Sequence, residues 1–164
     1  MPLSLEQIRE RLAARFPDAA GPVQPARDPF VVVAPFLLRE LATFLRDDEA
    51  LRFDFLQDET AVDHPAEELL RVVIHLWSYP HRHGFKLKVE LPRQEPRCPS
   101  LAAVWPAACW FEREIFDLFG VHFEGHPELR RLLMPDDWVG HPLRKDYREA
   151  GGYAGVSNER ENPL

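Results

Sequence analysis

Hydrophobic positions in the first third of the chain follow the period of amphipathic helices. Two stretches place apolar residues three or four apart and predict helices with one buried face: Leu5, Ile8, Leu12 and Phe16 in the first, Leu38, Leu41, Phe44 and Leu45 in the second. Ser4 and Gln7 form a capping box at the start of the first helix, and Pro17 ends it. Residues 18–29 predict a loop, and the largely β-branched run 30–33 predicts a short strand before a helix that begins at Pro35.

The middle of the chain changes to the period of two that is typical of strands. Residues 51–55 and 85–91 alternate apolar with charged side chains, residues 57–60 predict a turn, and residues 61–63 predict an extended segment. Residues 69–79 are apolar on both parities, so we expect a central strand buried on both faces, with His75 as a hydrogen-bonded core residue. A turn over residues 80–84 joins this strand to the next in a hairpin.

A third predicted helix over residues 110–119 carries charged as well as apolar residues. Its inward stripe consists of Phe111, Ile115, Leu118 and Phe119, and outside the stripe lie Glu112, Arg113, Glu114 and Asp117. Arg113 and Asp117 are four residues apart and can pair. Gly120 is a helix stop, and the apolar residues that follow it, up to Tyr147, have no period. We therefore expect this segment to lie on its own domain or on another protein.

These elements predict an α+β fold of two layers. Consecutive strands form hairpins, so we expect an antiparallel or mixed sheet with the helices on one face. The 164 residues are divided into one globular domain over residues 1–120 and a long, irregular C-terminal docking tail over residues 121–164.

Composition narrows the class of protein. The chain is 45% hydrophobic and 29% charged, as in soluble globular proteins, and its 16 prolines against 8 glycines suggest a stiff irregular portion. The formal net charge of -7 argues against a nucleic-acid surface. Cys98 and Cys109 are too few for a secreted disulfide scaffold, so we expect two buried thiols. We find no signal-peptide pattern and no apolar run of membrane-helix length, and expect a cytoplasmic protein that reaches a membrane only through partners.

A local repeat marks the tail. Gly-His-Pro occurs at residues 125–127 and again at 140–142, each time followed by a leucine and a basic pair. Glycine allows a left-handed turn, and proline restricts the residue before it, so each unit aims its side chains in a set direction. We expect a clamp on a partner, in which leucines fill apolar pockets and basic residues pair with carboxylates. Its members are Leu129, Arg130, Arg131, Leu143, Arg144 and Lys145. The alternative is a pair of ordinary turns on the protein's own surface.

The pattern around His122, Glu124 and His126 does not predict a metal site. The spacing is His-x-Glu-x-His, and Gly125 and Pro127 exclude the helix that would bring both histidines to one face. Two cysteines cannot hold an iron–sulfur cluster by four thiolates, and no glycine-rich nucleotide motif is present. We expect no cofactor or metal in this chain.

The charged residues of the third helix also have a simple explanation. Glu112, Glu114 and Asp117 surround Arg113, which fits a solvated or interface charge cluster better than an acid–base pair. We expect no catalytic residue.

Three motifs in this region resemble a known family. They are Glu-Arg-Glu-Ile-Phe-Asp-Leu-Phe-Gly at residues 112–120, Phe-Glu-Gly-His-Pro-Glu-Leu-Arg-Arg at 123–131 and Gly-His-Pro-Leu-Arg-Lys-Asp-Tyr at 140–147. In this order they resemble the C-type subunit family of proton-pumping NADH-quinone oxidoreductase, the thirty-kilodalton subunit family of respiratory complex I. The resemblance extends upstream to residues 53–56 and 70–105.

The resemblance implies a non-catalytic structural subunit of the hydrophilic arm, on the cytoplasmic side of the bacterial inner membrane. Such a subunit packs against the neighbouring D-type subunit and other arm subunits, while FMN and iron–sulfur clusters in partner subunits carry electrons from NADH to quinone. The implied interface residues, with the leucines of the clamp, are Glu112, Arg113, Glu114, Asp117, His126, Leu129, Arg130, Arg131, His141, Leu143, Arg144 and Lys145.

Two alternatives stay open. Related subunits serve membrane-bound hydrogenases and deazaflavin-dependent dehydrogenases, whose electron donor differs. A protein of another class would be a small metal-dependent hydrolase that uses His122 and His126, and stoichiometric zinc in the purified protein would favour it.

Removal of all residues after Gly120 is expected to leave a folded domain that no longer joins its complex, because the tail supplies the docking surface. Co-purification of the truncated chain with the complex at full yield would contradict the docking role.

Overall fold

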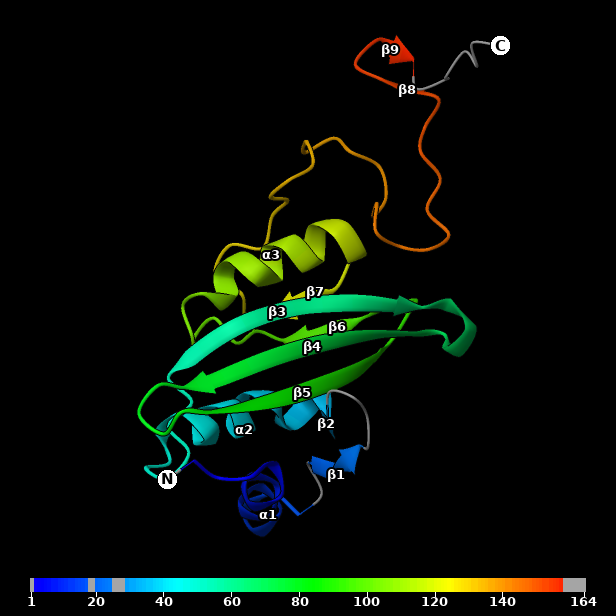
Figure 1. Ribbon diagram of the computed structural model, residues 1–164. Coiled ribbons are helices and arrows are strands. Elements are labelled where there is room, and N and C mark those ends of the chain that lie inside the picture. Colours follow the sequence, from blue (N-terminus) through cyan, green and yellow to red (C-terminus); the bar gives the residue numbers. More distant parts are fainter. Residues whose placement is uncertain (1, 18–19, 25–28, 158–164) are drawn as a thin grey trace, which may run out of the picture.

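The computed structural model describes residues 2–17, 20–24 and 29–157, and for residues 20–24 the backbone alone (Figure 1). The α-helices of these ranges are α1 (Leu5–Arg15), α2 (Leu38–Asp47) and α3 (Ala108–Phe119), with short 3-10 helices η1 (Pro35–Leu37) and η2 (Pro65–Glu67). The strands are β1 (Ala20–Gln24), β2 (Phe30–Val33), β3 (Phe55–His64), β4 (Leu69–Ser78), β5 (His83–Pro92), β6 (Arg97–Pro99), β7 (His122–Glu124), β8 (Gly152–Tyr153) and β9 (Val156–Ser157).

The five-stranded main sheet has the order β1-β2-β5-β4-β3. β3, β4 and β5 form successive antiparallel hairpins, whereas β2 runs parallel to β5. A parallel pair needs a long crossover, and the chain makes it through α2 and the two hairpins. The prediction of an α+β fold with a mixed sheet is confirmed.

The hydrophobic core lies on one face of this sheet. The even-numbered residues of β4 from Leu70 to Leu76 are buried and pair across to the buried residues of β5 from Phe85 to Leu91. All three helices contribute fully or nearly fully buried side chains to the same cluster, among them Leu12 from α1, Leu41 from α2 and Ile115 from α3. Figure 1 shows α3 beside β3 and α2 beside β5, so the helices extend across the width of the sheet.

Two predictions for β4 are wrong. Its odd-numbered residues from Leu69 to Trp77 are half-buried, so the strand is fully covered on one face only, and His75 lies on the half-exposed face. The physical reason is that apolar residues on the second face predict burial only if another layer covers them, and in the described chain all three helices pack on the first.

The segment before β4 also differs from its prediction. Residues 57–60, predicted to form a turn, lie inside β3, whereas of the predicted strand 51–55 only Phe55 belongs to β3. A turn over residues 49–51 and an irregular stretch over residues 52–54 precede β3. Asp48 causes this turn: its Oδ1 accepts from the backbone N–H groups of Ala50 and Leu51 at 3.0 and 3.1 Å, which competes with strand pairing. Residues 20–24, predicted within a loop, form β1.

Several local predictions are confirmed. The capping box of Ser4 and Gln7 is present, and Gly120 ends α3 with a left-handed φ of +77°. Cys98 is buried and Cys109 is half-buried, and both are free thiols, so only one of the two is the buried thiol expected. In the described ranges no helix is both long and apolar enough to cross a bilayer.

The first residues of the predicted tail are integral to the body. β7 pairs in parallel with β6, and Val121 and Phe123 are 0% and 1% exposed. The division at residue 120 stays a prediction, but a truncation that tests the tail alone has to begin after β7.

Phe123→Ala is expected to lower the free energy of unfolding by about 3–5 kcal/mol, because it leaves a cavity in the core. Urea denaturation followed by tryptophan fluorescence measures the change. His122→Ala, at the exposed neighbouring position of β7, is the matched control and is expected to change stability by less than about 0.5 kcal/mol. Equal effects of the two substitutions would contradict the placement of β7.

Candidate functional site

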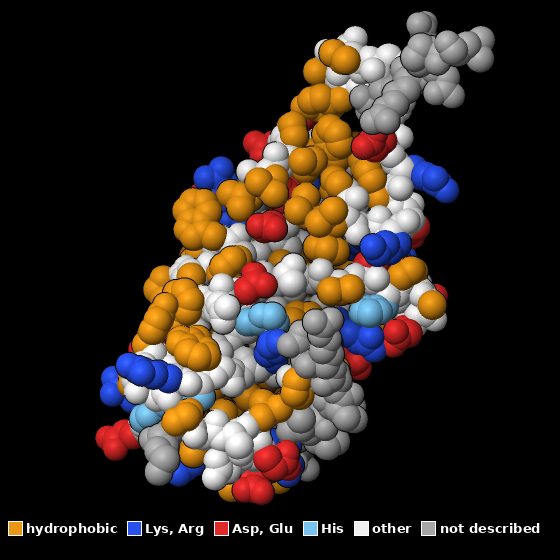
Figure 2. Space-filling view, viewed as in Figure 1, with side chains coloured by type: hydrophobic (Ala, Val, Ile, Leu, Met, Phe, Trp, Pro, Cys, Tyr) orange, Lys and Arg blue, Asp and Glu red, His pale blue; other side chains and the backbone are white. Residues whose placement is uncertain are grey.

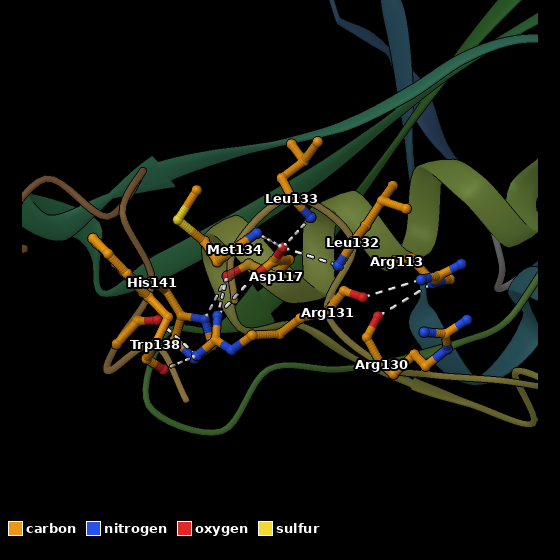
Figure 3. A network of polar contacts seen from close by, with 10 residues as sticks. Arg113, Asp117, Arg130, Arg131, Leu132, Leu133, Met134, Trp138 and His141 are labelled. Carbon is orange, nitrogen blue, oxygen red and sulfur yellow. Dashed lines mark hydrogen bonds and ion pairs between the residues drawn. The ribbon is translucent and has the colours of Figure 1, made fainter. Parts of the chain in front are cut away.

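The carboxylate of Asp117, in the last turn of α3, holds the tail against the body (Figure 3). Its Oδ2 accepts hydrogen bonds from three consecutive backbone N–H groups, those of Leu132, Leu133 and Met134, at 3.0, 2.7 and 2.8 Å. Burial of the side chain by itself raises the pKa of Asp117, but the hydrogen bonds from Met134 and Arg131 and from the other two N–H groups outweigh it, and the pKa lies below its ordinary value. An ionised, buried carboxylate thus fixes three residues of irregular backbone.

Arg131 joins the same site from the tail. Its Nη1 donates to Oδ1 of Asp117 at 2.7 Å and to the backbone oxygen of Asp117 at 3.2 Å. Its Nη2 donates to the carbonyl oxygens of Trp138 and Gly140 at 2.8 and 3.0 Å. One planar guanidinium therefore connects the helix to two carbonyl groups of a later segment of the tail, at residues 138 and 140.

The tail also supplies the hydrogen bonds that a helix lacks at its C-terminus. His141 Nδ1 donates to the carbonyl oxygen of Asp117 at 3.0 Å. The N–H group of Leu143 donates to the carbonyl oxygen of Leu118 at 3.0 Å. Arg144 Nε donates to the carbonyl oxygen of Phe119 at 2.7 Å. The guanidinium groups of the tail lie at the negative end of the helix dipole, where a positive charge is stabilising.

The repeated Gly-His-Pro units attach the tail to both ends of α3. The glycines, Gly125 and Gly140, have φ values of +82° and +83°, so the predicted left-handed turns are present. A Cβ atom at Gly140 would lie 2.9 Å from the ring of Tyr147. His126 Nε2 donates to the carbonyl oxygen of Cys109 at 3.0 Å in the first turn of the helix, as His141 does in the last turn.

The predicted pair between Arg113 and Asp117 does not form. Arg113 instead donates to the carbonyl oxygens of Arg130 and Arg131 at 3.2 and 3.0 Å, and its guanidinium carbon lies 5.3 Å from the centre of the Trp110 ring. The charged residues of this helix were expected to form a solvated or an interface cluster, and the solvated alternative is wrong for Glu112, Arg113 and Asp117, which are buried, while Glu114 is exposed. The tail covers this face of the helix and brings its own partners, which helical spacing cannot reveal.

A second attachment lies at the ends of β3 and β5. Arg93 Nε and Nη2 donate to the buried carboxylate of Asp63 at 2.7 and 3.0 Å, and Arg93 Nη1 donates to Asp146 at 3.0 Å. The N–H group of Lys145 donates to Asp63 at 2.8 Å. The bond from Arg93 lowers the pKa of Asp63 against the effect of burial, so this carboxylate is ionised at neutral pH. The tail is therefore fixed at two places by buried carboxylates.

Comparison with known proteins identifies the family. The model of the family described as "Respiratory-chain NADH dehydrogenase, 30 Kd subunit" matches residues 31–153. The chain belongs to this family. Among curated proteins named as the C-type subunit of NADH-quinone oxidoreductase, that of Moorella thermoacetica is 48% identical over 145 residues, which are 88% of this chain and 95% of the relative. That of Roseiflexus sp. is 47% identical over 148 residues, which are 89% and 85% of the two chains.

Solved structures share the fold of this thirty-kilodalton-family chain. A chain of the membrane-bound sulfane sulfur reductase, described as an archaeal respiratory membrane complex, superposes with a TM-score of 0.73 at 28% identity and covers 87% of this chain and 85% of that one. A trypsin-resistant fragment of Nqo5 superposes with a TM-score of 0.60 at 31% identity, covering 76% and 98%.

The structure places the predicted interface residues of this family member in three settings. Residues with side chains bonded within the chain around α3 are Glu112, Arg113, Asp117, His126, Arg131, His141 and Arg144. Leu129 is half-buried against the core. Exposed residues are Glu114, Arg130, Leu143 and Lys145, and of these Arg130 pairs with Glu128 at 2.9 Å. The basic pairs are thus divided between internal and outward-facing members.

Several residues of the site give no signal in the sequence. Asp63 and Arg93 stand in no motif and lie 82 and 53 residues from their tail partners, so local pattern does not reveal them. Leu133 and Val139 are apolar residues of the predicted tail, but only the structure shows that they are 56% and 82% exposed.

The two histidines considered for a metal site have different surroundings. His122 is exposed on β7, whereas the His126 ring bonds to the backbone of Cys109 and Glu128. Among the residues that the structure describes, no group of three or more His, Cys, Asp or Glu side chains is arranged to hold a metal ion.

Asp117→Asn is expected to release residues 131–144 from α3, because a neutral amide cannot hold the guanidinium and three N–H groups as a buried carboxylate does. The local free energy of opening should fall by about 3 kcal/mol. Amide hydrogen exchange at residues 132–134 measures it, and Glu114→Gln, which removes an exposed charge from the same helix, is the control. Unchanged protection in Asp117→Asn would contradict the assigned role.

Proposed function

We propose that the chain is a non-catalytic structural subunit of the hydrophilic arm of a proton-translocating NADH-quinone oxidoreductase, on the cytoplasmic side of a bacterial inner membrane. In this proposal FMN and iron–sulfur clusters lie in partner subunits and carry electrons from NADH to quinone. The chain itself fixes the positions of those partners, the D-type subunit first among them. The family and the name of its relatives support the complex, and the surface of the tail supports the role.

The observation that carries the proposal is the direction in which the tail side chains point. The half-buried Arg131 and Arg144 bond to α3, and Lys145 and Asp146 bond to Asp63 and Arg93 at the ends of β3 and β5. Four aliphatic side chains of the tail face outward: Leu133, Val139, Leu143 and Val156 are 56%, 82%, 49% and 68% exposed. Figure 2 shows hydrophobic side chains gathered on the part of the molecule that the tail forms. A contiguous exposed apolar surface on a soluble protein is typical of a protein–protein interface.

The charges around this surface fit the edge of an interface. Arg130 and Lys145 of the tail are exposed, as is Glu114 on α3. Charged residues at the edge of an interface direct association and its register more than they add affinity. Because buried carboxylates hold the tail in place beforehand, binding need not order it, which lowers the entropic cost of assembly.

A second candidate is a subunit of a related respiratory membrane complex with another electron donor. The likeness to a chain of the membrane-bound sulfane sulfur reductase favours it, since the same fold serves that complex. The proposed structural role of the tail is the same in both cases, and the partners that co-purify distinguish them.

The test replaces Leu133, Val139 and Leu143 together by Asn in the native host, with an affinity tag on this chain. We expect the partner subunits recovered with the tagged chain to fall at least about tenfold, because each lost apolar contact weakens binding by roughly 1 kcal/mol or more. Mass spectrometry identifies the partners: NADH-oxidising flavin subunits support the oxidoreductase, and their absence supports the second candidate.

The control is Val62→Asn, which removes an aliphatic group that is 40% exposed on β3, outside the tail. It is expected to leave recovery unchanged. Full recovery of partners with the triple variant would show that the tail surface is not the interface.

A further inference from the structure

A buried glutamate with no partner lies between the sheet and α3. Glu59 is opposite Ile74 in the β3–β4 pair, so its side chain points to the helix-covered face, and it is 3% exposed. No residue in the described part of the chain donates a hydrogen bond to either of its carboxyl oxygens. A polar side chain in this position is costly, and an ionised one far more so.

Glu112 of α3 is the charged group from another element that acts most strongly on Glu59, and its surroundings are different. It is fully buried, yet its Oε2 accepts from the hydroxyl of Ser100 at 2.6 Å and its Oε1 from the N–H group of Leu101 at 2.5 Å. Arg39 of α2 also stabilises its charge, and His126 Nε2 lies 4.0 Å from its Oε2. Of the two carboxyl groups, Glu112 has donors for a negative charge, and Glu59 has none within the described chain.

We propose that Glu59 and Glu112 form a buried proton-binding site in which Glu59 keeps its proton at neutral pH and Glu112 is the group that ionises first, and that α3 packs on β3 most stably while the proton on Glu59 is retained. This site is separate from the attachment of the tail at Asp117. It goes beyond the proposed function because it concerns a proton that the chain binds when it folds.

The other acidic groups near the pair bring no positive charge that could take the place of the proton on Glu59. Asp58, beside Glu59 on β3, adds a negative charge, and Cys98 on β6 is a buried thiol whose pKa is raised by burial and by the surrounding glutamates, including Glu124 of β7. Burial, followed by the charges of Glu112 and Asp58, raises the pKa of Glu59 well above its ordinary value. Burial raises the pKa of Glu112 to about 7 against the bonds from Ser100 and Leu101.

The direction of the pH effect follows from these shifts. The unfolded chain loses the proton of Glu59 near the ordinary pKa of a glutamate, roughly 4.3, while the folded chain keeps it to a much higher pH. Over that interval the folded state binds more protons, so the free energy of unfolding falls as pH rises, until the folded state also ionises. The stabilisation is complete at acidic pH and is lost toward alkaline pH.

The test compares the melting temperature of the full chain and of Glu59→Gln between about pH 5 and pH 8. Glutamine copies the neutral acid and does not titrate, so the difference in Tm, variant minus wild type, is expected to grow by about 3–5 °C per pH unit over this range. Glu114→Gln, on the exposed face of α3, is the control and should follow the wild type. A Tm difference that stays constant with pH overturns the proposal.

Infrared spectroscopy of the wild type gives a second measurement, which does not depend on whether the variant folds. At about pH 8 carboxyl groups of ordinary pKa are ionised, so a remaining carbonyl band of a protonated acid reports a buried proton. We expect this band in the wild type and its loss in Glu59→Gln. Its absence from the wild type overturns the proposal.

Discussion

The carboxylate of Asp117 holds more of the irregular tail backbone than any other side chain of the described residues. Residues 121–147 contain a single short strand, β7, so most of their backbone N–H and C=O groups have no partner within a regular element. Asp117 accepts three of these N–H groups and the Arg131 guanidinium, and the free carbonyl groups at the end of α3 accept the next donors along the tail. Irregular backbone is thus held by the end of a helix, which has unpaired groups of its own. Without the carboxylate, the donors on the tail would face a surface with too few acceptors.

This arrangement reverses the usual placement of side chains. In most surface segments polar groups face water and apolar groups face the body, but here Arg131 and Arg144 face the body while Leu133, Val139 and Leu143 face outward. The cost of burying charge at Asp117 and Asp63 is offset because each of these carboxylates accepts from a guanidinium and from at least one backbone N–H group. The result is a segment that is bonded to α3 and presents exposed aliphatic side chains.

α3 shows how surroundings decide the state of identical chemical groups. Asp117 and Glu112 are both buried on the same helix. Asp117 has four donors, among them a guanidinium, and its pKa is lowered, whereas Glu112 has fewer donors and a second carboxyl group nearby, and its pKa is raised to about 7. The last turn of the helix therefore holds an ionised carboxylate that binds the tail, whereas Glu112, nearer the first turn, belongs to the pair for which we propose a bound proton.

The sequence by itself determined the helices, the hairpin of β4 and β5, the stop at Gly120 and the left-handed turns at Gly125 and Gly140, because each depends on the periodicity or backbone preference of neighbouring residues. It also determined the family, through motifs that are contiguous in the chain. Only the tertiary structure decided which face of β4 is covered, which arginine binds Asp117, and that Asp63 and Arg93 meet the tail. These contacts join residues 14 to 82 positions apart, and long, charged side chains can reach many partners at that separation. The packing of whole helices and strands decides which partner each side chain binds, and a local sequence pattern does not reveal it.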